Sequence, residues 1–328
     1  ATPPQTWDQL RDIAKYFDGK DNGLGGTVSG VSLPFRVGGQ GKHHFASLSA
    51  PYVIGPDNPN LYWFDPDDMN PLCCSQGHVR AAMMLKELFQ LGPKEMSGWT
   101  LDEAWDYFLK GNAVFTWSGG GVMPLAIAHK APTAGKIGAA PLPGAMAYIN
   151  PKTGAETKVA SPNVVGNTTG DSWSGIVMRS APDPELAYYL FALLATEPKQ
   201  RFFAARLIDG IDPARTYQIP TPLGDGSIDD YTAQGWDAPD AMEYTAAFFH
   251  TFGNDLQLPY LRIPGSERYW SALDVRISEF MTGEAATAEA TLTNLADDWN
   301  AITDDLDRET QLQSYLISLG LPVAPPSD

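Results

Sequence analysis

The sequence is short of positive charge. Its 328 residues carry 22 Lys and Arg against 39 Asp and Glu, a formal net charge of −17. Nucleic acids and anionic membrane surfaces are bound through basic faces, so the composition argues against both classes of partner. Charged residues make up only 19% of the chain, so the acidity comes from scarce cations more than from dense carboxylates. Apolar residues make up 43%, so we expect a folded chain rather than a disordered acidic tail.

Long apolar runs and cysteines are also scarce. No apolar stretch reaches the roughly 18 residues of a membrane-spanning helix, so we expect no direct span. The two cysteines, Cys73 and Cys74, are neighbours, and the residues leave both reduced thiols and a strained vicinal disulfide open. No Cys/His spacing is typical of zinc, and adjacent His43 and His44 would point to opposite faces of a strand. We therefore expect no metal and no cofactor.

Capping signals and helical periodicity predict most of the helices. Thr6 with Gln9, and Thr100 with Glu103, form capping boxes before amphipathic stretches. Further helices are expected at 78–91, 185–195, 198–207, 240–249, 267–281 and 288–306. Short strands are expected at 31–35, 113–117, 136–144 and 174–178, with a polar hairpin or long loop over 145–170. Short strands that alternate with helices predict an α/β fold.

Motif searches leave one class of enzyme open. The glycine cluster at Gly38–Lys42 departs from the phosphate-loop pattern, and Ser174 takes the last glycine position of a serine-hydrolase elbow at Ser172. Paired carboxylates for glycoside hydrolysis are not excluded, because nothing singles out a pair among Asp65, Asp67, Asp68 and Asp171. We expect a protein that is not an enzyme, with a glycosidase-like carbohydrate hydrolase as the alternative.

The tryptophans are more informative than the ionisable residues. Trp117, Trp173 and Trp270 lie at the ends of predicted elements, beside Ser, Gly or charged residues. An indole offers a flat apolar face that matches the C–H face of a sugar ring, and a neighbouring Asp or Arg can bind hydroxyls. Ordinary core packing is the alternative for each of them. Trp7, Trp105 and Trp299 lie on helix faces and are expected in the core.

Several segments, taken in order, resemble the family-1, maltose-binding-like solute-binding proteins of ABC importers. Residues 2–10 resemble that family's Pro-Pro-Lys-Thr-Trp-Asp-Glu-Leu helix start, and Gly135–Gly144 resembles its Gly-Lys-Ile-Gly-Val-Ala-Pro-Leu-Pro-Gly segment. Other segments that follow the family's order are Phe108–Phe115, Trp117–Gly119, Ser174–Met178, Asp183–Glu197, Asp212–Arg215 and Phe280–Trp299. The order across residues 2–305 makes the match specific, whereas 19–75 and 225–260 fit poorly.

The resemblance implies an α/β, periplasmic-binding-protein-like (type II) fold with two lobes joined by hinge crossings. Residues 1–170 would form the first segment of the second (C-terminal) lobe. Residues 171–228 would return to the first (N-terminal) lobe, and residues 229–328 would complete the second lobe with its closing helices and tail. The family's opening βαβ units do not precede the Thr-Trp-Asp helix here, so the first lobe would be incomplete. Ile176–Val177 and Leu186–Leu194 would then face a partly missing core.

The resemblance also implies a function. The chain would reversibly capture a small polar solute, a carbohydrate or polyol, for delivery to the membrane permease of an ABC importer. It would act in the periplasm or outside the cell, with a lipid anchor in a Gram-positive source. A ligand that contacts both lobes favours their closed arrangement.

The resemblance and the aromatic pattern together give a set of ligand-binding residues. Two tryptophans would stack on the solute, an arginine would donate bidentate hydrogen bonds, and an aspartate with a third tryptophan would lie where the chain crosses between lobes. A serine and a histidine are further candidates. In that order, these residues are Trp117, Trp270, Arg215, Asp171, Trp173, Ser118 and His43.

Overall fold

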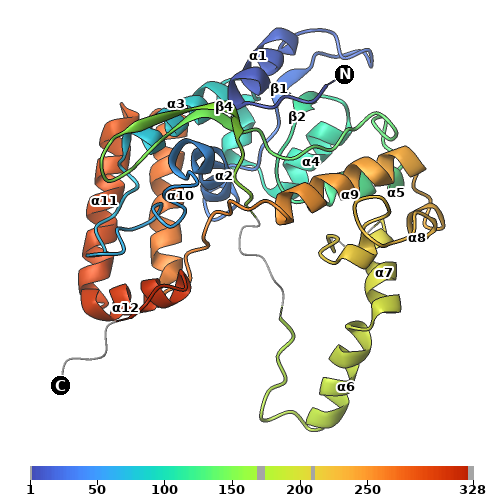
Figure 1. Cartoon of the computed structure of the whole chain (residues 1–328). Helices are drawn as coiled ribbons and strands as arrows, with labels where there is room; N and C mark the ends of the chain where they lie inside the picture. Colours follow the sequence, from blue (N-terminus) through green and yellow to red (C-terminus); the bar gives the residue numbers. More distant parts are fainter. Residues whose placement is uncertain (1, 168–173, 208–210, 324–328) are drawn as a thin grey trace. The chain divides into compact units, whose positions relative to one another are not determined.

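The computed structural model describes residues 2–167, 174–207 and 211–323, which divide into two units (Figure 1). Unit 1 comprises residues 1–118, 142–169 and 254–328, and unit 2 comprises residues 119–141 and 170–253. The expected lobe segments divide the chain differently, because they place 119–141 and 229–253 with the second lobe. The division into lobes therefore stays a prediction.

Unit 1 is a helical body with two small sheets. Its helices are α1 (Trp7–Phe17), α2 (Gly41–Val53), α3 (Gln76–Phe89), α4 (Leu101–Leu109), α10 (Ser266–Thr282), α11 (Ala288–Asp305) and α12 (Arg308–Ser318), with a 3-10 turn, η1, at Lys94–Gly98. Strands β1 (Ser29–Val31) and β2 (Ala113–Phe115) pair in parallel, with Ser29 opposite Ala113. Strands β3 (Ala145–Ile149) and β4 (Glu156–Asn163) form the antiparallel hairpin expected after residue 145.

The two predicted capping boxes begin helices as expected. At α1, the Gln9 N–H donates to the Thr6 hydroxyl (3.2 Å), while the Gln9 side chain accepts from the Gln5 N–H (2.8 Å) rather than from that of Thr6. At α4, the Thr100 N–H donates to Glu103 Oε2 (2.7 Å), and both arms of the box are present. These contacts satisfy backbone donors that the first turn of a helix leaves without partners.

Helix α2 was not predicted. Eleven of its thirteen residues are buried, so its sequence has no polar face and lacks the periodicity that marks an amphipathic helix. Its N-cap residue, Gln40, makes no side-chain capping bond, and Pro51 lies inside it. The adjacent histidines, His43 and His44, therefore stand on the first turn of a helix. The strand assumed for them was wrong.

Both ends of α2 are held by side chains from distant parts of the chain. At its start, the buried Asp274 of α10 accepts from the N–H groups of Gly38 (2.5 Å) and Lys42 (3.2 Å). At its end, the side-chain amide of Asn163 in β4 donates to the carbonyls of Pro51 (2.8 Å) and Ile54 (2.7 Å). These contacts supply partners to the backbone groups at the two ends of a buried helix.

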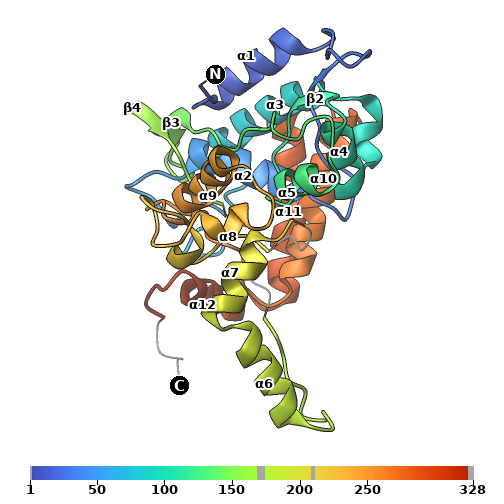
Figure 2. The same cartoon turned by 90° about the vertical axis from the view of Figure 1, so that its right-hand side faces the viewer.

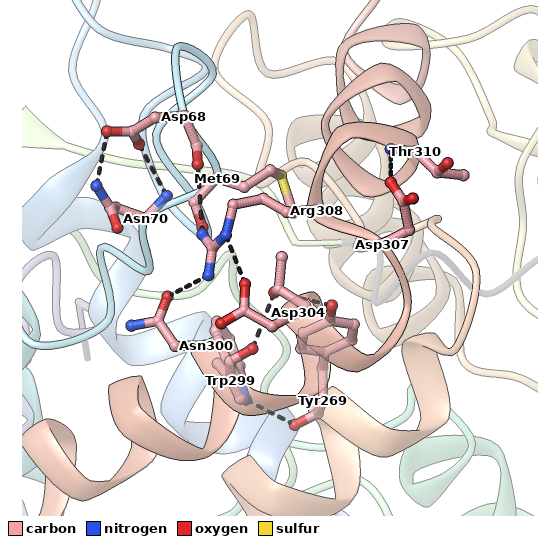
Figure 3. A network of polar contacts seen from close by, with 11 residues as sticks. Asp68, Met69, Asn70, Tyr269, Trp299, Asn300, Asp304, Asp307, Arg308 and Thr310 are labelled. Carbon is pink, nitrogen blue, oxygen red and sulfur yellow. Dashed lines mark hydrogen bonds and ion pairs between the residues drawn. The ribbon is translucent and has the colours of Figure 1, made fainter.

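Helix α12 was also not predicted, and it is fixed to unit 1 by Arg308 (Figure 3). The guanidinium donates to Asp304 (2.8 Å) and Asn300 (2.9 Å) of α11 and to the carbonyl of Met69 (3.2 Å). Asp307 begins the helix by accepting from the Thr310 N–H (3.0 Å). Nearby, the indole of Trp299 donates to the carbonyl of Tyr269 (3.0 Å), which joins α11 to α10.

Unit 2 consists of helices and connecting segments among its described residues (Figure 2). These helices are α5 (Val122–Ala128), α6 (Pro184–Leu194), α7 (Glu197–Ala205), η2 (Thr216–Gln218), α8 (Asp229–Thr232) and α9 (Ala238–Phe252). A small core forms around Tyr231, Trp236 and Tyr244. The Trp236 indole donates to the carbonyl of Ala205 (2.9 Å), and the Tyr231 hydroxyl donates to that of Gln218 (2.7 Å). Helix α6 contributes no buried residue.

Two of the expected strands are absent. Residues 136–144 contain only an isolated bridge between Thr6 and Gly144, and residues 174–178 pair with no described strand. An apolar run becomes a strand only when a neighbouring strand accepts its backbone hydrogen bonds, and the sequence pattern does not supply that neighbour.

The sequence left the state of the two cysteines open and predicted no membrane-spanning segment. Cys73 and Cys74 are both free thiols, the first buried and the second exposed. Among the helices of the described residues, none is long and apolar enough to cross a membrane.

Arg308→Ala should lower the free energy of unfolding by about 1–2 kcal/mol, because it removes charge-assisted hydrogen bonds to α11 and to the loop at Met69. Urea titration monitored by circular dichroism measures this. Arg268→Ala is the matched control. Arg268 also pairs with a carboxylate at the end of α11, but the pair with Asp305 is exposed, so its loss should cost less than about 1 kcal/mol. Equal losses in the two variants would contradict the role of Arg308.

Candidate functional site

Four of the predicted ligand-binding residues lie in unit 1. His43 is on the first turn of α2, Trp117 and Ser118 follow β2, and Trp270 is in α10. Consecutive residues on a helix point about 100° apart, so His43 and His44 reach in different directions. The His43 ring lies 5.2 Å from that of Trp270, and the His44 ring lies 5.9 Å from that of Trp117. The first turn of α2 thus contacts both tryptophans that were predicted as stacking platforms.

Trp270 is enclosed by other rings. Tyr260 stacks on it at 5.3 Å with an interplanar angle of 28°, and Trp63 meets it edge-on at 5.0 Å. Only 4% of Trp270 is exposed. Its indole N–H is buried and has no hydrogen-bond partner among the described residues.

Trp117 is enclosed in a similar way. Trp7 lies edge-on to it at 5.3 Å, and only 7% of Trp117 is exposed. Its indole N–H is also buried with no partner among the described residues. The following residue, Ser118, accepts a hydrogen bond from the indole of Trp105 (2.7 Å). We call Trp7, His43, His44, Trp117 and Trp270 the imidazole–indole cluster; the role of its tryptophans as ligand platforms stays a prediction.

Two histidines are buried: His44 on the first turn of α2 and His78 in α3. Burial lowers the pKa of His44 to about 3, and His43 acts in the same direction. Burial also lowers the pKa of His78 to about 3, against the opposing effect of a backbone hydrogen bond with Leu72. Its Nδ1 lies 2.8 Å from the Ser75 hydroxyl. The Nε2 atoms of His44 and His78 are buried and have no partner among the described residues. Both imidazoles are therefore neutral at pH 7, and each can accept or donate one hydrogen bond.

The remaining predicted site residues lie elsewhere. Arg215 is exposed in unit 2, where it precedes η2 and donates its N–H to Gln218 Oε1 (2.9 Å). Asp171 and Trp173 lie outside the described residues. Unit 1 therefore holds four of the seven predicted residues and unit 2 holds Arg215.

The structure adds polar groups that sequence reasoning missed. In unit 2, the Tyr244 hydroxyl donates to Asp212 (3.3 Å), and burial, followed by the charge of Asp212, raises the pKa of Tyr244. A side chain at Gly120 would collide with Phe248 and lie 2.9 Å from Asp212, so the loop needs glycine there. The glycines and the Asp-Pro-Ala-Arg segment were visible in the sequence, but their proximity was not.

The carboxylates of the acidic loop proposed for a glycosidase pair have partners within the protein. Lys152 Nζ lies 2.8 Å from Asp65 and 2.6 Å from Asp67. Asp68 accepts from the backbone and the side chain of Asn70 (2.9 and 2.6 Å). In the part of the chain that the structure describes, no group of three or more His, Cys, Asp or Glu residues could hold a metal ion.

Comparisons with solved structures identify the fold. The maltose-bound MalE3 of T. maritima has a TM-score of 0.61 and 18% identity, and the match covers 92% of this chain and 66% of that one. An ABC transporter solute-binding protein of Agrobacterium radiobacter K84, in complex with ribitol, has a TM-score of 0.60 and 15% identity. The match covers 92% of this chain and 65% of that one. One from Agrobacterium vitis S4, with bound D-mannitol, has a TM-score of 0.59 and 14% identity. The match covers 94% of this chain and 68% of that one.

Comparisons of the amino-acid sequence found no match. No protein-family model matches the chain, and no curated protein matches it. The chain spans about two thirds of the length of the solved structures that it matches. The fold is therefore α/β and periplasmic-binding-protein-like (type II), as the sequence predicted, and about a third of that fold has no counterpart in these residues.

Asp274→Asn should lower the free energy of unfolding by about 1.5–3 kcal/mol, because the Gly38 and Lys42 N–H groups lose a charged acceptor in a buried position. Urea titration at pH 7 measures the loss. Asp305→Asn, which changes an exposed carboxylate, should cost less than about 1 kcal/mol. Wild-type stability in Asp274→Asn would refute the role of Asp274 at the start of α2.

Stability should fall as the pH falls from 7 to 5. His44 and His78 have pKa values near 3 when folded and about 6.5 when unfolded, so the unfolded chain binds more protons between these values. The stabilisation is fully present above pH 6.5, and each histidine should lose about 1–2 kcal/mol by pH 5. His44→Phe should shrink this loss, whereas replacing the exposed His250 with Gln should not. The midpoints of urea unfolding at pH 7 and pH 5 measure this loss for the wild type and both variants. If the loss were unchanged in His44→Phe, the pH dependence would not come from His44.

Proposed function

We propose that this chain is the solute-binding component of an ABC importer that reversibly captures a small polar solute, a carbohydrate or polyol. The observation that carries the proposal is the match over 92–94% of the chain to solved structures described as binding maltose, ribitol and D-mannitol. The partner would be a membrane permease of the importer. The site of action would be the periplasm or the cell exterior, with a lipid anchor in a Gram-positive source.

Within unit 1, the imidazole–indole cluster supports this proposal. A buried N–H group without a partner costs about 1–3 kcal/mol, and the indoles of Trp117 and Trp270 each carry one within the described residues. A solute hydroxyl is an acceptor of the right kind for such a donor, and it reaches these N–H groups only if the rings that enclose the two indoles move aside. In the proposal, His43, Trp117, Ser118 and Trp270 contact the solute from unit 1. Arg215, Asp171 and Trp173 contribute the other contacts.

The proposal includes no catalytic step. A carbohydrate-active hydrolase would need one carboxylic acid and one carboxylate on either side of the scissile bond. Lys152 pairs with two of the four candidate carboxylates, Asp65 and Asp67, which favours a structural role for that loop. A binding protein returns its sugar unchanged, so formation of a reducing sugar from an oligosaccharide would favour the hydrolase instead.

Maltose, ribitol and D-mannitol form the first panel for a thermal-shift screen, with isothermal titration of any hit. At least one should raise the melting temperature, because a ligand that binds only the folded chain stabilises it by mass action. The mixture is then analysed by chromatography, where the sugar should be recovered unchanged. No shift with any sugar or polyol would remove the carbohydrate proposal and leave the fold intact.

Arg215→Gln should weaken binding of the hit at least about tenfold, because it removes a charge-assisted, bidentate donor. Arg179→Gln is the matched control, since Arg179 is also an exposed arginine of unit 2. Titration of both variants, with circular dichroism as the folding check, measures the effect. Equal affinities in the two variants would exclude Arg215 from the site.

A further inference from the structure

An open groove of unit 1 lies between α1, α3 and the β3–β4 hairpin (Figure 2). Its volume is about 520 Å³, within the roughly 300–1,000 Å³ of sites that bind small molecules. We call it the methionine groove, because three methionines line it beside a tyrosine and several charged residues. The residues that carry the argument are Met83, Met84, Met146, Tyr52, Arg80 and Lys158.

The methionine groove is separate from the imidazole–indole cluster. No member of that cluster lines it. Tyr52 is on the last turn of α2, nine residues after His43, which is about 13 Å along the helix axis. The inference drawn from the groove therefore does not depend on the proposed solute-binding function.

The methionines give the groove an apolar surface that is open to solvent. Met83 of α3 is 47% exposed and Met146 of β3 is 45% exposed, whereas Met84 is buried beside them. Methionine side chains are flexible and polarisable, so they adapt to apolar groups of different shapes. An apolar lining with a few polar groups is typical of a site for a small organic molecule.

Tyr52 supplies a hydroxyl that the protein does not use. The residue is only 5% exposed and lines the groove, and its hydroxyl has no hydrogen-bond partner among the described residues. Burial raises the pKa of Tyr52, and Asp8 acts in the same direction, while Arg80 and Arg11 act against it. The hydroxyl therefore stays protonated at pH 7 and can donate a hydrogen bond into the groove.

Two of the cations in the groove are available to a ligand. Arg11 is held by two carboxylates of its own helix, at 3.0 and 2.9 Å. Arg80 has a weaker pair with Glu156, at 3.4 Å, in which both side chains are about 40% exposed, and such a pair contributes little stability. Lys158, two residues after Glu156 on the same face of β4, has no ion pair among the described residues.

We propose that the methionine groove binds a small organic carboxylate with an apolar body. The carboxylate accepts hydrogen bonds from Arg80, Lys158 and the Tyr52 hydroxyl, and the apolar body lies against the three methionines. Because the unused groups are donors, the groove favours an anion over a cation. Carboxylates also line the groove, so a head with one negative charge is favoured over a phosphate with two.

The test compares 4-phenylbutyrate with 4-phenylbutan-1-ol, which has the same apolar body but no charge. Both are titrated into protein labelled with carbon-13 at the methionine methyl groups, with signals assigned by Met→Leu variants. The signals of Met83, Met84 and Met146 should shift and saturate with 4-phenylbutyrate, while that of the buried Met96 in η1 should not. The alcohol should bind at least about tenfold more weakly, because it forms no charge-assisted hydrogen bonds. No saturable shift, an equal shift at Met96, or equal affinity for the alcohol would overturn the proposal.

Two variants test the polar contacts. Lys158→Gln and Tyr52→Phe should each weaken 4-phenylbutyrate binding at least about fivefold, because each removes a donor to the carboxylate. Lys94→Gln, at an exposed lysine of η1 in unit 1, is the matched control and should bind as the wild type does. Tyr52→Phe should keep the wild-type urea midpoint, since the hydroxyl has no partner among the described residues. Wild-type affinity in Lys158→Gln or Tyr52→Phe, or an equal loss in Lys94→Gln, would contradict the assigned contacts.

Discussion

Unit 1 depends on a buried helix whose ends are held by side chains from distant parts of the chain. Helix α2 has almost no exposed surface, so water cannot satisfy the backbone groups at its two ends. Asp274 accepts from the first turn and from Gly38, and Asn163 donates to carbonyls at the last turn. A backbone group left without a partner in such a site would cost about 1–3 kcal/mol, so these two side chains fix where α2 begins and ends.

The position of α2 also determines the geometry of the candidate site. Because His43 and His44 stand on its first turn, they contact Trp270 and Trp117, which come from two different parts of the sequence. Trp63 and Tyr260 then hold the Trp270 ring, while Trp7 holds that of Trp117. The indoles are thus set in a rigid aromatic core, with their N–H groups as the polar elements.

Unit 2 differs from unit 1 in how its apolar residues are used. Its core around Tyr231, Trp236 and Tyr244 is small, and α6, although almost entirely apolar, takes no part in it.

The sequence by itself determined the elements whose signals are local. The capping boxes at Thr6 and Thr100 and the apolar stripes of α3, α10 and α11 predicted helices, because a cap or a helical face involves residues within a few positions of each other. The ordered resemblance predicted the type II fold. Helix α2 escaped notice because a fully buried helix has no periodicity and its end partners, Asp274 and Asn163, lie more than one hundred residues away.

Only the tertiary structure decided the rest. The segments at 136–144 and 174–178 look like strands, but no strand neighbour reaches them within the described residues, and strand formation depends on that neighbour. The sequence selected Trp117, Trp270 and His43 as separate candidates, and the structure brought them together through the first turn of α2. It also enclosed both indoles in the core. Side-chain chemistry can be read from a sequence, but proximity and burial depend on long-range packing.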